Sequence, residues 1–487
     1  MTVSQEMNIG MNFGRVANAN PTHEAIVAAD ITISYGKLWR IVRGFATRMR
    51  ELGIDRSSTV AVHSRDMIAC VASMLAASLL GARCVFLEAR LVGDGVVMPT
   101  HILRSPDVTP FRDLTYHVID ASWPQAASPD PDSSEFPGYG DADDPWWVVH
   151  TSGTTGKPKY LNISQRAVYG RSMAVQDDFK PLHTRVCSLF PCNSRPFIAR
   201  ANAALLNACT IIDTIEIEFM RAQGVSLVYG APRTAIEWLA NRVISPKIPV
   251  IQVSGAKLSD ADAAVLLQSF DAVEDVYGSS ETSKSFVNVK TLNQGQVVTR
   301  GQHLDSEVQI LGSDGMPCTS PDLQGTVRIR NDYMASAYIA EPQATEKAFR
   351  DGWYYPGDFG WWGPAGELVI GGRLDEVINL GGVKIDPAVV DEVLYSVPGI
   401  TGAASFRDPQ NETSPPRLMA LVTVSDLAVA DKCVAAAHLA CRERLAAFMA
   451  PQRIFVVPSI PMTSDGAPRR TECQLLAQAM IKKVNLG

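Results

Sequence analysis

The chain lacks several features that would assign it to a special class of protein. Among its 487 residues no two cysteines form a Cys-x-x-Cys pair, so we expect neither structural zinc nor a disulfide framework. The nine scattered cysteines favour a reducing, cytoplasmic location. There is no long run of lysine and arginine, and the net charge is −7, which argues against a nucleic-acid partner.

Long apolar runs are also scarce. The stretch from Met67 to Leu80 is interrupted by Ser73 and Ser78 and is too short to span a bilayer, so it predicts a buried helix and no membrane span. Residues 1–18 contain no basic segment followed by an apolar one, so we expect no secretory signal.

What remains is an ordinary globular composition, with 46% hydrophobic and 20% charged residues, in a chain too long for one core. Apolar periodicity predicts a helix over residues 35–52, a strand over 59–62, a buried helix over 66–80 and a strand over 84–87. This alternation is typical of βαβ units and a parallel sheet.

The alternation continues through the middle of the chain and changes character near residue 375. We predict an α/β fold, with a large N-terminal domain (1–374) of parallel or mixed sheets with flanking helices and a smaller, mobile α+β domain (375–487). The further predicted elements are strands 225–229, 250–253, 273–277, 418–424 and 454–457, and helices 233–243, 260–270, 387–395 and 434–448.

The most informative stretch runs from His150 to Lys159 and reads His-Thr-Ser-Gly-Thr-Thr-Gly-Lys-Pro-Lys. It follows an apolar segment, 146–149, and combines hydroxyls, glycines and lysines, which is the chemistry of a loop that holds a polyphosphate at the end of a strand. It is not the Gly-x4-Gly-Lys-[Ser/Thr] loop of the NTPases, because Thr151 replaces the first glycine and Pro158 follows Lys157.

The run instead resembles the phosphate loop of the AMP-forming acyl-activating enzymes, a superfamily of acyl-CoA synthetases, peptide-synthetase adenylation domains and luciferases. Further segments resemble the family's motifs in the same order: residues 254–258, 277–282, 352–358 and 371–387. The resemblance covers nearly the whole chain. It implies that ATP, Mg²⁺ and a small carboxylic acid bind here, with CoA or a carrier-protein pantetheine as the acceptor.

The resemblance also assigns roles to individual residues. Glu281, which follows a predicted strand among small residues, would hold Mg²⁺; Asp358 and Arg373 would hold the ribose side. Asp375 would be the hinge of the small domain. The catalytic set would be Thr154, Lys157, Glu281 and Arg373. The nucleotide would also contact Thr151, Ser152, Gly153, Thr155, Gly156, Gly255, Ala256, Lys257, Tyr277, Gly278 and Ser279. The thiol channel would contain Gly381, Gly382 and Lys384.

The sequence departs from the family pattern in two segments. Pro356 replaces the threonine that usually precedes the Gly-Asp pair. In the last segment, Ser464 to Arg470, Ala467 stands where the family has a lysine, while Arg470 matches the family's arginine and Arg469 is additional. Losing a charged donor at a developing anion commonly costs about 10²–10³ in rate.

The reaction implied by the resemblance joins an acid to AMP with release of pyrophosphate, then transfers the acyl group to a thiol. Two alternatives stay open: transfer to an amine, and a nucleotide-binding homologue whose catalysis is impaired at Ala467. An acyl carrier protein is a further candidate partner. We expect the protein to be a monomer or a homodimer.

The motifs do not identify the acid that is activated. We expect the acid pocket to contain Cys192, Asn193, Phe197, Tyr229 and Ser280. The segment has no evident aspartate for an α-amino group, which favours an aryl or short acyl acid. Arg195 or Arg200 could bind a second carboxylate, although such arginines are more often structural.

Overall fold

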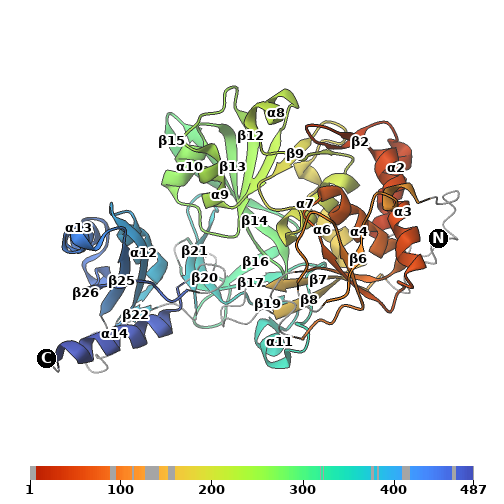
Figure 1. The fold of residues 1–487 in the computed structure, drawn as a ribbon. Coiled ribbons are helices and arrows are strands. Elements are labelled where there is room, and N and C mark those ends of the chain that lie inside the picture. The colour runs from red at the N-terminus through yellow and green to blue at the C-terminus, as the bar shows by residue number, and fades with distance from the viewer. Residues whose placement is uncertain are drawn as a thin grey trace.

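The computed structural model describes residues 7–87, 95–111, 114–126, 142–151, 159–318, 320–321, 323–374, 378–380, 383–408, 417–462 and 468–485. Figure 1 shows the C-terminal residues as a separate blue lobe at one end of the molecule and the first helices, in red, at the other. The mixed α/β fold, with a large N-terminal and a small C-terminal domain, confirms the predicted fold class. No helix of the described chain is long and apolar enough to cross a bilayer.

A nine-stranded sheet forms the centre of the large domain, in the order β15-β14-β13-β12-β11-β9-β10-β1-β2. Its inner strands are parallel, and β2, β14 and β15 run antiparallel to their neighbours. The strands are β1 (Glu24–Val27), β2 (Thr32–Ser34), β9 (Arg185–Ser188), β10 (Thr210–Ile212), β11 (Leu227–Gly230), β12 (Ile248–Ser254), β13 (Phe270–Ser279), β14 (Ser283–Asn293) and β15 (Gln296–His303).

A second sheet has six strands in the order β6-β5-β3-β4-β7-β8. The largest hydrophobic core joins one face of this sheet to one face of the nine-stranded sheet through the helices between them. The strands are β3 (Thr59–His63), β4 (Arg83–Phe86), β5 (His101–Arg104), β6 (His117–Val118), β7 (Pro145–Thr151) and β8 (Lys159–Ser164); the helices are α2 (Ile9–Ala19), α3 (Tyr35–Glu51), α4 (Met67–Leu80), α6 (Gln165–Met173) and α7 (Arg195–Leu206).

Helix α4 illustrates how the sequence sets these boundaries. The Asp66 side chain accepts a hydrogen bond from the Ala69 backbone N–H, and Gly81 ends the helix with a left-handed φ of 70°. Nearly every residue between them is buried, which explains why the segment is apolar on all sides.

The opposite face of the nine-stranded sheet is covered by three short helices around a second core. These are α8 (Ile217–Ala222), α9 (Pro232–Leu239) and α10 (Asp260–Leu266). Four 3₁₀ turns among the described residues complete the connections: η1 (Trp123–Gln125), η3 (Gln176–Asp178), η4 (Leu427–Val429) and η5 (Ala447–Met449).

A third sheet lies towards the C-terminal lobe and carries two of the motif segments. Its order is β18-β19-β17-β20-β21, with β16 paired to β17. Its elements are β16 (Glu307–Leu311), β17 (Gly325–Arg330), α11 (Pro342–Ala348), β18 (Phe349–Arg350), β19 (Trp353–Tyr354), β20 (Asp358–Trp362) and β21 (Leu368–Arg373).

The C-terminal residues form a hairpin, a three-stranded sheet and cores of their own. The elements are β22 (Ile378–Leu380), β23 (Val383–Ile385), α12 (Pro387–Tyr395), β24 (Ile400–Arg407), β25 (Leu418–Val424), α13 (Ala430–Arg444), β26 (Arg453–Val456) and α14 (Arg470–Asn485).

Most predicted elements occur, but some ends differ. Helix α10 stops at Leu266 rather than residue 270, because β13 already begins at Phe270. Helix α13 begins four residues earlier than predicted, at Ala430, and ends at Arg444. Apolar periodicity continued into the separate turn η5, which is why the predicted helix ran too far.

Candidate active site

The two strands that flank the predicted phosphate loop are paired at its base. Thr151, the last residue of β7, is in register with Lys159, the first residue of β8. The intervening run, with Ser152, Gly153, Thr154, Thr155, Gly156 and Lys157, lies outside the described residues. The Lys159 ammonium lies 5.1 Å from the centre of the Tyr338 ring, so the end of the loop adjoins the surroundings of Glu281 described next.

Glu281 lies in the tight turn between β13 and β14, and its side chain is buried. The Tyr338 hydroxyl donates a hydrogen bond of 2.7 Å to Glu281 Oε1. Burial and this carboxylate raise the pKa of Tyr338, which keeps the hydroxyl a proton donor. A buried carboxylate with one neutral donor suits a hard cation, and oxygen is the ligand that Mg²⁺ prefers.

Arg171, from α6, fixes the backbone of the same turn. Its guanidinium donates to the carbonyl oxygens of Tyr333 (3.0 Å), Ser280 (3.2 Å) and Glu281 (2.8 Å). Burial, with the nearby Arg195, lowers the pKa of Arg171 to about 9. Gly278 is required at the start of the turn, because a β-carbon there would collide with the carbonyl of Ser283.

A second group joins the nine-stranded sheet to the third sheet. The Tyr277 hydroxyl donates a hydrogen bond of 2.6 Å to Asp358 Oδ2, and Arg373 Nη1 lies 3.1 Å from Asp358 Oδ1. Asp358 and Arg373 are partners in the β20–β21 ladder, which explains their contact across 15 residues of sequence. Each carboxylate oxygen can accept further hydrogen bonds, so ribose hydroxyls could still bind Asp358.

The two residues before Asp358 shape the same corner. The Pro356 carbonyl accepts a hydrogen bond from Arg373 Nη1, so the proline that replaces the family threonine still takes part in the site through its backbone. Gly357 has a left-handed φ of 84°, and a β-carbon there would lie 3.0 Å from Arg373 Nη2. Only glycine lets the chain pass this close to the guanidinium.

The predicted adenine segment follows β12. Ser254 ends that strand, and Gly255, Ala256 and Lys257 are exposed, with Gly255 at a left-handed φ of 92°. Burial raises the pKa of Asp386, and the Lys257 ammonium offsets part of that rise, so this segment adjoins the C-terminal domain. The roles of these residues towards adenine stay predictions.

A cavity of ≈ 170 Å³ opens beside the β13–β14 turn, between α6, α7 and the ends of β11 and β12. Among the residues singled out in the sequence, those that line it are Tyr229, Gly255, Gly278, Ser279, Arg195 and Arg200. Most of its wall is apolar, including Val168, Val175, Phe179, Phe190 and Ala199.

The other residues predicted for the acid pocket lie elsewhere. Phe197 packs into the large core at 2% exposure. Cys192 donates through Sγ to the Arg65 carbonyl at 3.0 Å, and Ser280 contributes its carbonyl to Arg171. Asn193, half-buried, precedes α7.

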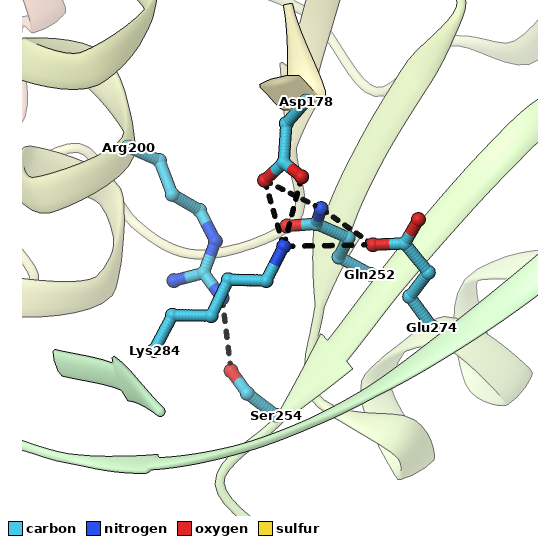
Figure 2. Close-up of polar contacts among 6 residues, drawn as sticks. All are labelled: Asp178, Arg200, Gln252, Ser254, Glu274 and Lys284. Carbon is cyan, nitrogen blue, oxygen red and sulfur yellow. Dashed lines mark hydrogen bonds and ion pairs between the residues drawn. The ribbon is translucent and has the colours of Figure 1, made fainter. Parts of the chain in front are cut away.

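The cavity also contains charged residues that motif reasoning missed: Arg171, Asp178 and Lys284, with Gln252 beside them. Figure 2 shows Lys284 between the carboxylates of Asp178 and Glu274, with the Gln252 amide bridging the same two groups. A polar Gln252 within the apolar strand 248–253 was the one available signal, since buried polar side chains need partners.

In the C-terminal domain, the arginine that matches the family motif is used internally. Arg470 Nη2 lies 2.8 Å from Asp391 Oδ2, and Nη1 donates to the Ser405 carbonyl at 2.6 Å. Arg469 pairs with Glu472 at 3.0 Å. Asp375, Gly381, Gly382 and Ala467 lie outside the described residues; Lys384 is in β23, but its side chain is not described.

The described part of the chain contains no group of three or more His, Cys, Asp or Glu side chains placed to share a metal ion. A magnesium ion bound here would therefore combine the Glu281 carboxylate with oxygens of its ligand, which is how Mg²⁺ is often held beside phosphates.

Comparison with known proteins finds CoA ligases among the relatives of the chain. The chain is 28% identical over 241 residues to an oxalate–CoA ligase of Arabidopsis thaliana (49% of this chain, 46% of the relative). It is 25% identical over 472 residues to a 4-chlorobenzoate–CoA ligase of Arthrobacter sp (88% and 87%). The chain thus spans about half the length of the first relative and most of the second.

Solved structures show the same fold. O-succinylbenzoate coenzyme A synthetase (MenE) from Bacillus subtilis, in complex with AMP, superposes with a TM-score of 0.80 at 20% identity, covering 96% of this chain and 97% of that one. The amide bond synthetase McbA from Marinactinospora thermotolerans gives 0.74 at 19% identity, covering 96% and 99%. A model of one family, described as AMP-binding enzyme, matches residues 13–339, and on that match the chain belongs to the AMP-binding enzymes.

Proposed function

We propose that the protein activates a small carboxylic acid with ATP, forms an acyl-AMP with release of pyrophosphate, and transfers the acyl group to the thiol of CoA. The observation that carries the proposal is that Tyr277, which is bonded to Asp358, and Glu281 flank Gly278 and Ser279, two residues that line the cavity, in a member of the AMP-binding enzymes. The CoA ligases among its relatives support the choice of thiol.

Some of these residues would position the substrates, and others would compensate the charge of the phosphates. Glu281, held by Tyr338 and by the turn that Arg171 fixes, would bind the magnesium ion that accompanies the leaving pyrophosphate. Asp358, oriented by Tyr277 and Arg373, would accept the ribose hydroxyls and so place the α-phosphorus beside the cavity. The segment from Thr151 to Lys157 would hold the phosphates. No covalent enzyme intermediate is needed, so orientation and electrostatics supply the rate.

The thiol step would use the C-terminal domain. We propose that this domain begins at residue 375, turns about Asp375, and brings Gly381, Gly382 and Lys384 to the thiol channel. Substituting Asp375 with proline should leave the adenylation step active and abolish thioester formation, because proline fixes the backbone angle that a hinge must change. Loss of both steps together would contradict the hinge.

Exchange of labelled pyrophosphate into ATP tests the first step directly. The exchange should depend on an added acid, and a panel of aryl, short acyl and amino acids identifies the class. Product analysis with CoA against a set of amines then tests the acceptor, since McbA, an amide bond synthetase, shares the fold. An amide product without thioester would replace the thiol step of the proposal.

Ala467 offers a separate test of whether the site is fully catalytic. Alanine stands where the family has a lysine, and restoring Ala467→Lys should raise the exchange rate by about 10- to 100-fold if that charge is simply missing. Background exchange with every acid, in a protein that still binds ATP, would instead identify a nucleotide-binding homologue impaired in catalysis.

A further inference from the structure

The charged side chains around the cavity fall into two sets, and in the first set each charged group is already paired with another member of the set. Lys284 Nζ lies 2.9 and 2.8 Å from the two oxygens of Asp178 and 3.6 Å from Glu274 Oε2. Gln252 Nε2 donates to Asp178 at 2.9 Å and to Glu274 at 2.7 Å (Figure 2). Each carboxylate therefore already has two donors, and the lysine already has two acceptors.

Arg200, on α7, belongs to the second set. Its Nη1 donates to the Pro196 carbonyl at 3.2 Å and its Nη2 to Ser254 Oγ at 3.1 Å, and both acceptors are neutral. Its Nε is buried and has no hydrogen-bond partner. Among the described residues no carboxylate lies within ion-pair distance of this guanidinium, although Figure 2 shows the Asp178–Lys284 pair nearby. A buried charge with unused donors is costly unless an anion meets it.

The surroundings hold Arg200 at the cavity wall. Its guanidinium carbon lies 4.8 Å from the centre of the Tyr229 ring and 5.4 Å from that of Phe190, so two aromatic faces support it. Arg195, five residues earlier on the same helix, lines the cavity too; its Nη2 donates to the Ser279 carbonyl at 2.6 Å, and its Nε is also buried without a partner.

The two arginines are close enough to repel each other. Burial chiefly lowers the pKa of Arg195 to about 10; the Glu281 carboxylate opposes this shift and Arg200 adds to it. Burial raises the pKa of Glu274; the Lys284 ammonium opposes that rise and the adjacent Asp178 adds to it. The cavity therefore has Arg195 and Arg200 on its α7 side, and at its base Lys284 and Glu274 together with Asp178, which favours the charged form of Arg200 without pairing with it.

On the basis of the proposed function, we propose that the acid substrate carries a second carboxylate and that Arg200 binds it. The fork of the guanidinium matches a carboxylate, and the apolar walls would cover the carbon body between the two acid groups. With ≈ 170 Å³ available, the body is a short acyl chain or a single aromatic ring. An acid bearing an amine fits poorly, since Asp178 and Glu274 already hold Lys284.

Matched pairs of acids test this proposal. Pyrophosphate exchange is measured with benzoate against its three benzenedicarboxylates, and with pentanoate against glutarate, in the wild type, Arg200→Met, Arg200→Lys and the exposed control Arg221→Met. At least one diacid should exceed its monoacid by about 10- to 100-fold in the wild type, the value of a buried charge-assisted pair. Arg200→Met should remove that preference, Arg200→Lys should keep part of it, and Arg221→Met should keep all of it.

Binding is measured separately, by the shift of the thermal unfolding midpoint with each acid, so that a catalytic failure does not hide the result. A diacid that stabilises the wild type but not Arg200→Met supports the proposal even if no acid supports exchange, in which case the proposed function fails and this inference stands. Monoacids that bind and exchange better than every diacid, or a diacid preference unchanged in Arg200→Met, would overturn it.

Discussion

The Tyr277–Asp358–Arg373 group, proposed to face the nucleotide, and the cavity proposed to hold the acid share strand β13 but are built in different ways. Along β13, Tyr277 reaches Asp358 on one side, whereas Glu274 and Val276 serve the cavity and its base on the other. On the nucleotide side the partners come from recognisable motifs; on the cavity side they come from α6, α7 and isolated positions of β12 and β14. The chemistry common to a family can therefore be read from motifs, while the chemistry of an individual substrate is spread over residues that belong to none.

The substitution expected to have the largest effect on one of these two regions is at Glu281. We expect Glu281→Gln to lower the exchange rate by about 10²–10³, because the amide removes the charge that would hold the metal ion. The acid should still bind, and the exposed control Glu218→Gln should leave both properties unchanged. An active Glu281→Gln enzyme would show that the metal is held elsewhere.

A substitution at Asp358 tests the proposed nucleotide site separately, because Asp358 does not line the cavity. Asp358→Asn should raise the KM for ATP in exchange by about 10- to 100-fold, since a charged acceptor of the Tyr277 and Arg373 donors is lost. The KM for the acid should hardly change. Asp271→Asn, at an exposed position of β13, the strand that carries Tyr277, is the control, and a larger effect on the acid than on ATP would reverse the assignment.

Arg171 is the residue at which the two regions meet. Arg171→Lys should lower the free energy of unfolding by about 2 kcal/mol, because lysine cannot serve three carbonyl oxygens at once. The exchange rate should fall as well, since the Glu281 turn loses its support. Arg166→Lys, on the same helix with a 41% exposed side chain, is the control measured by the same denaturant titration.

The smallest effect is expected at the closed base of the cavity. Because the pKa of Glu274 is raised in the folded protein, the folded state binds this proton more tightly than the unfolded chain, so the stability it contributes is present at low pH and lost as pH rises through the raised pKa. Glu274→Gln should therefore lose less stability than the wild type as the pH rises above about 4, the unfolded-state pKa of a glutamate, through its raised folded-state pKa. An unchanged pH profile, equal to that of Glu346→Gln, would mean that Glu274 is not the titrating group.

The sequence predicted the family, the fold class and most buried elements, because apolar periodicity and the motif order depend on local residues. It predicted Tyr229 in the cavity but also Phe197, which the structure buries in the core. The difference comes from helix phase: Arg195, Ala199 and Arg200 of α7 line the cavity, while Phe197 and Ile198 point into the core. A strand would have sent alternate residues to the cavity, whereas Ser194 as the N-cap and Pro196 in the first turn are local signals of the helix.

The base of the cavity could not be predicted for a related reason. Asp178, Gln252 and Lys284 are 74 and 32 residues apart along the chain, and only the sheet brings them together. Asp178 and Lys284 pair only in the folded protein, and Gln252 carries no charge, so none of the three is conspicuous in the sequence. A closed network of this kind becomes visible once the tertiary contacts are known.

Arg171 has a practical consequence for anyone who wishes to change the acid that this protein accepts. Its guanidinium forms part of the cavity wall and also supports the backbone that carries Glu281. Redesign that replaces Arg171 would disturb the Glu281 carboxylate, which we propose to bind the metal, together with the shape of the cavity. Mutational libraries at Ala199, which lines the cavity from α7, would vary the shape of the accepted molecule without removing Arg171 or its contacts to the Glu281 turn.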